Sequence, residues 1–163
     1  MYGSDVDRST FTSGLQLATR CAVAATLAFA MAQVLKLDYP VFALIAAVIG
    51  TDLTPAQSRE LGLRRLIATV VGAVLGAAGT SLGFVGVWAV GPSILIAMII
   101  CQLVGASEGA KVAGYICALI VLLDESTQPW HYAFFRMVET ALGVSVAWSI
   151  SYVPKLLRPD DDG

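Results

Sequence analysis

Two arginines, each followed at the same spacing by a threonine and a glycine, are the residues of this sequence best suited to chemistry. Arg65, Thr69 and Gly72 match Arg136, Thr140 and Gly143 at a constant offset of 71 residues. A guanidinium group binds a carboxylate through two parallel hydrogen bonds in a fixed geometry. The pair therefore predicts a site that meets an organic anion from two sides. The alternative is that two helix-starting arginines coincide by chance with common small residues.

The chain around these arginines has the composition of a membrane protein. Hydrophobic residues make up 57% of the sequence and charged residues 13%, and the mean hydropathy is +0.77. These values exclude an ordinary soluble domain. No charged residue occurs between Arg65 and Glu108, a run too long for one membrane helix and suited to two joined tightly. The net charge of −2 and the lack of a long basic block give no indication of nucleic-acid binding.

Apolar runs predict six membrane-spanning helices. The first is expected at 15–35, the second at 41–50, the third and fourth within 66–107, the fifth at 112–123 and the sixth at 133–153. Thr54 and Pro55 are typical of a helix start and predict the entry to the third helix. The third and fourth helices are expected to divide at 80–86, with Gly91-Pro92 as the alternative turn. The second and fifth runs are too short to cross a hydrocarbon core of about 30 Å alone.

We expect the chain to divide into a polar lead-in at 1–11, a membrane domain at 12–158 and an acidic tail at 159–163. A cleaved signal peptide is the alternative for the first apolar run, but this run continues through Val34-Leu35, which favours a retained helix. Eight of the ten basic residues lie in or near the cytoplasm if both termini are placed there. The sequence thus predicts a multi-pass protein of a bacterial-type inner (plasma) membrane with cytoplasmic termini.

The repeated arginine, threonine and glycine motif also predicts an internal repeat, with repeat one at about 12–82 and repeat two at about 85–154. Ala43-Leu44-Ile45 echoes Ala118-Leu119-Ile120, and each is followed by an aspartate, Asp52 or Asp124. Because each repeat holds three helices, an odd number, the second is expected upside down relative to the first. The predicted fold class is an all-α membrane protein of six transmembrane helices in two inverted three-helix repeats. The short second and fifth helices then indicate a path between the halves.

Further charged residues have two interpretations each. Arg20 lies within the first apolar run, where it either faces a cavity or extends to the membrane interface. Glu139 follows Arg136 by about one turn and is either its ion-pair partner or a proton carrier. Asp52 and Asp124 are candidates for the same two roles.

No metal site, cofactor or enzymatic activity is expected. The sequence has a single histidine, His131, and no phosphate-binding loop or nucleophile motif. Cys21, Cys101 and Cys117 all lie in apolar runs, where cysteine behaves as a small hydrophobic residue.

The sequence resembles the aromatic acid exporter superfamily, which includes fusaric acid resistance proteins and, more distantly, the aluminium-activated malate channels of plants. The resemblance covers most of 12–158 and lies in Tyr39-Pro40-Val41-Phe42, in 62–72, in 136–143 and in Pro154. Ala68 stands where the family usually has glycine. The soluble domain and the second six-helix unit that are frequent in the family are not seen in this sequence.

The resemblance implies a transporter that exports small organic anions, aromatic or other carboxylates. Arg65 and Arg136 would attract and orient the carboxylate, Arg20 would contribute midway, and Thr69 and Thr140 would donate hydrogen bonds. The expected partners are the lipid bilayer, the anion and a second copy of the chain, by analogy with double-length members; a dimer is favoured, and no nucleic acid is expected. A passive anion channel and a structural oligomerising module without transport are the alternatives.

Overall fold

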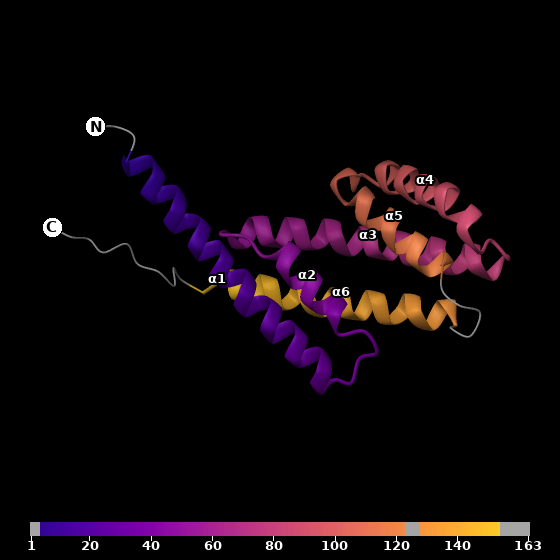
Figure 1. Ribbon diagram of the computed structural model, residues 1–163, viewed down its shortest axis with the longest axis horizontal. Helices are drawn as coiled ribbons and strands as arrows, with labels where there is room; N and C mark the ends of the chain where they lie inside the picture. The colour runs from indigo at the N-terminus through magenta and orange to yellow at the C-terminus, as the bar shows by residue number, and fades with distance from the viewer. Residues whose placement is uncertain (1–3, 123–127, 154–163) are drawn as a thin grey trace.

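The computed structural model describes residues 4–122 and 128–153, and within these ranges the chain is helical and contains no strand (Figure 1). The helices are α1 Ser4–Val34, α2 Val41–Gly50, α3 Pro55–Ser81, α4 Val87–Leu103, the one-turn 3-10 helix η1 Ser107–Gly109, α5 Ala110–Val121 and α6 Pro129–Ser151. The predicted all-α class is confirmed. Helix α1 begins at Ser4, so it extends into the segment expected to be a polar lead-in.

Within the described residues, three helices are long and apolar enough to cross a membrane: α1 over Phe11–Val34, α3 and α6. The remaining helices are shorter. Helix α2 has 10 residues, and at 1.5 Å per residue it is about 15 Å long, half of a hydrocarbon core. The long and short helices follow the lengths of the apolar runs in the sequence.

The ends of α3 are set by local sequence signals. The Thr54 hydroxyl accepts a hydrogen bond from the Gln57 N–H at 3.4 Å, and Pro55 occupies the first turn, where no N–H partner is required. After α3 the chain turns through Gly83 and Gly86, whose φ angles of +82° and +89° are strained for residues with a side chain. The turn therefore lies where the sequence predicts it, and the alternative site, Pro92, lies inside α4.

Helices α3 and α6 lie side by side and antiparallel at the centre of the molecule (Figure 1). At one end the hydroxyls of Ser58 and Ser151 are 2.5 Å apart, and at the other the Trp130 indole N–H donates to the Ser81 hydroxyl at 3.1 Å. Helix α5 packs against α3 and α4, whereas α2 packs against α6 and α1. Each long central helix is thus covered by one short helix.

Glycines of the two echoed motifs make these contacts between long and short helices. A Cβ atom on Gly143 of α6 would overlap the carbonyl oxygen of Ala43 on α2. A Cβ atom on Gly72 of α3 would likewise overlap the carbonyl oxygen of Ala113 on α5. The small residues therefore allow the backbones to approach closely, as is usual for helices packed in a membrane.

Candidate functional site

A group of charged and aromatic side chains lies where α2, α3, α5 and α6 meet; the charged side chains are buried, whereas Tyr115 is 38% exposed. Arg65 is 5% exposed, Arg136 2% and Glu139 0%. The central cluster, as we call it, consists of these three residues and the aromatic residues Tyr39, Phe42, Tyr115 and Tyr132. Arg136 lies within electrostatic range of Arg65, Glu139, Tyr115 and Tyr132. The fold therefore brings together the two arginines that the sequence singles out.

The flat face of the Arg136 guanidinium group packs on aromatic rings, and one edge of the group has no hydrogen-bond partner. Its Cζ atom lies 3.1 Å from the centroid of the Phe42 ring and 5.8 Å from that of Tyr132, which is a cation–π arrangement. Its Nε and Nη2 are buried and have no hydrogen-bond partner. These two nitrogens lie on the same edge of the guanidinium plane, and paired N–H groups of this kind bind the two oxygens of a carboxylate.

Arg65 is in a similar position on α3. Its Nη2 donates to the Tyr115 hydroxyl at 3.2 Å, while Nε and Nη1 are buried without a partner. The Thr69 hydroxyl donates to the Arg65 carbonyl at 2.9 Å, so it is bonded within its own helix. Buried charged groups without hydrogen-bond partners are destabilising in an apolar environment. With four unpartnered nitrogens on its two arginines, the central cluster is short of acceptors and suited to an anion.

Glu139 contacts the start of α2. Its Oε1 accepts a hydrogen bond from the Tyr39 backbone N–H at 2.7 Å, two residues before the helix begins, where the positive end of the helix dipole favours a carboxylate. Its Oε2 is buried and has no partner. Since Nε and Nη2 of Arg136 also lack partners, the described side chains form no hydrogen-bonded ion pair between Arg136 and Glu139.

Arg20 is placed apart from the central cluster. Its Nη1 donates to the Leu53 carbonyl and its Nη2 to the Val153 carbonyl, both at 2.7 Å. The partner residue Val153 comes two residues after Ser151. Ser151 itself lies fifteen residues after Arg136 on α6, which is roughly 22 Å along the helix axis. Arg20 therefore joins α1 to the chain before α3 and after α6.

Replacing Arg20 by glutamine is expected to lower the stability of the protein by about 1–3 kcal/mol, because two charge-assisted hydrogen bonds are lost. The melting temperature of the purified protein in detergent measures this effect. Arg20→Lys, which keeps the charge but lacks the planar fork, should give a smaller decrease. A normal melting temperature in Arg20→Gln would contradict this stabilising role.

The other predicted site residues are distributed over three places. Thr140 is buried on α6, one turn after Arg136. Asp52 lies in a separate pocket of about 190 Å³ near the start of α3. Asp124 lies outside the described residues. Of these residues, Thr69 and Thr140 are the two that lie on the same helix as an arginine of the central cluster, each one turn after it.

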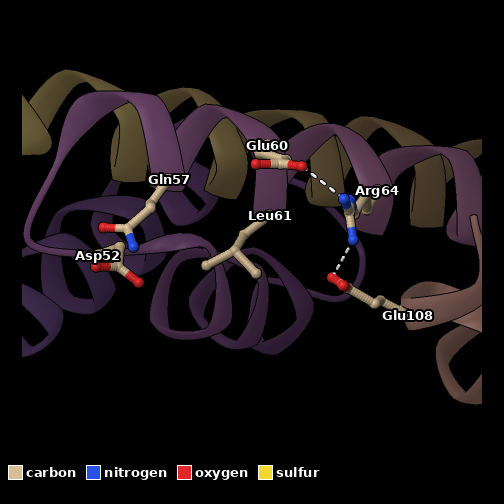
Figure 2. Close-up of a pocket in the computed structure, with 6 residues that line it drawn as sticks. All are labelled: Asp52, Gln57, Glu60, Leu61, Arg64 and Glu108. Atoms are coloured by element: carbon tan, nitrogen blue, oxygen red, sulfur yellow. Dashed lines mark hydrogen bonds and ion pairs between the residues drawn. The ribbon is translucent and has the colours of Figure 1, made fainter.

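The pocket at Asp52 is crossed by a surface ion-pair network (Figure 2). Arg64 pairs with Glu60 at 2.5 Å and with Glu108, and its side chain is 35% exposed. The Asp52 Oδ1 accepts from the Leu53 N–H at 2.6 Å. Although Arg64 is adjacent to Arg65 in the sequence, it pairs with two carboxylates at the surface, whereas the Nε and Nη1 of Arg65 are buried without a partner.

The aromatic members of the central cluster were not identified as site residues from the sequence. Tyr132, Arg136 and Glu139 are spaced at i, i+4 and i+7, which places them on one face of a helix, and this spacing is a signal that could have found Tyr132. Phe42 and Tyr115 come from the short helices, and nothing local links them to either arginine. Among the described residues, no group of three or more His, Cys, Asp or Glu side chains could hold a metal ion.

The structure has apolar helices long enough to cross a membrane, and they enclose buried ionisable residues. The protein is therefore of the class of helical membrane proteins with a polar interior. The family described as aromatic acid exporter family member 1 matches residues 16–153. The chain belongs to this family, as the sequence motifs predict. The family is one of membrane exporters of aromatic acids, so the chain is placed in a transporter family. Neither the curated proteins nor the solved structures that were compared with the chain give a match.

Proposed function

We propose that the chain exports small organic anions, aromatic or other carboxylates, by binding them in the central cluster. The observation that carries the proposal is the pair of buried arginines with four unpartnered nitrogens. The Nε and Nη2 edge of Arg136 would hold the carboxylate, and Arg65 would supply the second positive charge. Thr69 and Thr140 would offer hydroxyl groups nearby, and Arg20 would meet the anion only beyond the central cluster.

The positions of the two arginines along the helices support a path with two mouths. Arg65 follows Ser58 by seven residues, and Arg136 follows Trp130 by six, so each lies roughly 10 Å inside an opposite end of the α3–α6 pair. An anion entering from either end would first meet a different guanidinium. Handing the carboxylate from Arg65 to Arg136 would move it across the middle of the membrane.

The proposal includes two inverted repeats, α1–α3 and α4–α6, that make six crossings with both termini at the cytoplasmic side of the inner membrane. If α1 is exchanged with α4, α2 with α5 and α3 with α6, every pair of α-helices in contact maps onto a pair that is also in contact. This symmetry of the contacts supports the two repeats. The contacts of Gly143 with Ala43 and of Gly72 with Ala113 favour Ala113 as the counterpart of Ala43. The similarity of the two short segments in the sequence instead pairs Ala43 with Ala118, five residues further along the chain.

Replacing Arg65 by glutamine is expected to weaken benzoate binding about tenfold to 100-fold, because hydrogen bonds to charged groups contribute about 1.5–3 kcal/mol. Isothermal titration calorimetry of the protein in lipid nanodiscs measures the affinity. The matched control is Arg64→Gln, one residue away, which removes a surface arginine that already has two carboxylate partners and should leave the affinity unchanged. Equal affinities in both variants and the wild type would contradict the proposal.

A structural module without transport would place its arginines at caps and interfaces. Arg20 comes nearest to that description, since two of its nitrogens donate to backbone carbonyls and only its Nε is buried without a partner. Arg65 and Arg136 each have two buried nitrogens without a partner. Large benzoate currents in the absence of a proton gradient would identify a passive channel instead of a coupled exporter. We also propose a homodimer in the bilayer, which cross-linking in the native membrane would detect.

A further inference from the structure

We infer that Glu139 sets the charge of the anion accepted by the central cluster and thereby selects monocarboxylates over dicarboxylates. This inference rests on the proposed function and adds a specificity-determining residue to it. Glu139 is fully buried, and it is the acidic member of a cluster whose two other charged residues are arginines. Its role follows from the charge balance of the site and from the bonds that its carboxylate makes.

The charge balance favours a ligand with one negative charge. With Glu139 ionised, the two guanidinium groups and the carboxylate leave one positive charge in the central cluster. A bound monocarboxylate brings the total to zero, whereas a dicarboxylate leaves an excess negative charge. Uncompensated charge is strongly unfavourable inside a membrane protein, where Coulomb interactions are weakly screened.

Among the described residues, Arg136 is the one cation that acts electrostatically on Glu139. The charged and titratable groups in electrostatic range of Arg136 are Arg65, Glu139, Tyr115 and Tyr132, and those affecting Glu139 are Arg136 and Asp38. Asp38 adds negative charge near the start of α2. A second carboxylate would therefore meet Glu139, whose Oε2 has no hydrogen-bond donor, and like charges repel.

Glutamine at position 139 separates this role of Glu139 from a purely structural one. It keeps the side-chain volume and keeps an oxygen to accept the hydrogen bond from the Tyr39 N–H, but it removes the negative charge. The structural contact with the start of α2 therefore survives, and only the charge of the central cluster changes. Aspartate at the same position keeps the charge on a shorter side chain.

The test compares benzoate with isophthalate, which carries a second carboxylate on the same ring, at mildly alkaline pH, where an ordinary carboxyl is ionised. Titration calorimetry of the intact protein in nanodiscs gives both affinities. Glu139→Gln is expected to shift the affinity ratio toward isophthalate by about tenfold or more, equivalent to about 1.4 kcal/mol. Glu139→Asp should keep the wild-type preference. The exposed control Glu60→Gln, a partner of Arg64, should also keep it.

An unchanged ratio in a Glu139→Gln protein that still binds benzoate would overturn the inference and leave the proposed function intact. If the wild type binds neither ligand, the proposed function itself fails. Should Glu139→Gln not fold, the wild type alone decides the matter through the monomethyl ester of isophthalate, which has one charge on a ring substituted at the same positions. The ester is expected to bind and isophthalate to be rejected, and equal binding of the two would overturn the inference.

Discussion

Replacing Arg136 by glutamine is expected to reduce benzoate flux about 100-fold or more, since removing one partner of a desolvated, hydrogen-bonded charge pair typically costs 2–5 kcal/mol. Arg136 presents two buried nitrogens on one edge, and its face is fixed against Phe42. A carboxylate that binds this edge makes two hydrogen bonds in a geometry that no other described side chain of the central cluster offers.

Efflux of labelled benzoate from proteoliposomes measures the effect, normalised to the amount of folded protein. Arg136→Lys should recover only a small part of the flux, because an ammonium group keeps the charge but cannot form the bidentate contact. Arg64→Gln serves as the matched control and should transport normally. Wild-type flux in Arg136→Gln would show that the buried guanidinium is not part of the path.

Replacing Gly143 by alanine is expected to destabilise the protein by about 2–3 kcal/mol or to prevent folding, because overpacking a close contact forces the backbone to move. The new Cβ atom would overlap the Ala43 carbonyl oxygen and lie 2.7 Å from the Ala46 Cβ. Helix α2 would be pushed away from α6, and with it Phe42 from Arg136. Transport should therefore fall together with stability.

The control for this substitution is Gly91→Ala in α4, where a Cβ atom has nothing within 4 Å and alanine favours the helix by about 1 kcal/mol. The melting temperature in detergent should fall in Gly143→Ala and stay level or rise in Gly91→Ala. A normal melting temperature in Gly143→Ala would contradict the close approach of α2 and α6.

Features with a local cause could be predicted from the sequence. The helix start at Thr54 and Pro55 depends on neighbouring residues, and the turn before α4 depends on glycines with positive φ. Arg65 and Arg136 were recognisable because charged residues are rare in apolar helices and the two share a motif. The family followed from the same short stretches and is confirmed.

Features that depend on distant residues could not be predicted. Arg20 donates to carbonyls 33 and 133 positions away, and a backbone carbonyl carries no sequence signal. From the sequence, Glu139 is either an ion-pair partner of Arg136 or a proton carrier, and neither interpretation points to the hydrogen bond that it accepts from the Tyr39 N–H, 100 positions away. The stacking of Arg136 on Phe42 likewise depends on how α2 packs on α6.

The most direct test of the central claim is the flux of benzoate and of its neutral isostere benzamide into proteoliposomes that contain the wild type or the Arg65→Gln/Arg136→Gln double variant. If the buried arginines bind the carboxylate, the wild type should take up benzoate with saturable kinetics and should not accelerate benzamide entry. The folded double variant should lose the benzoate flux. Equal benzoate flux through the wild type and the double variant would contradict the claim.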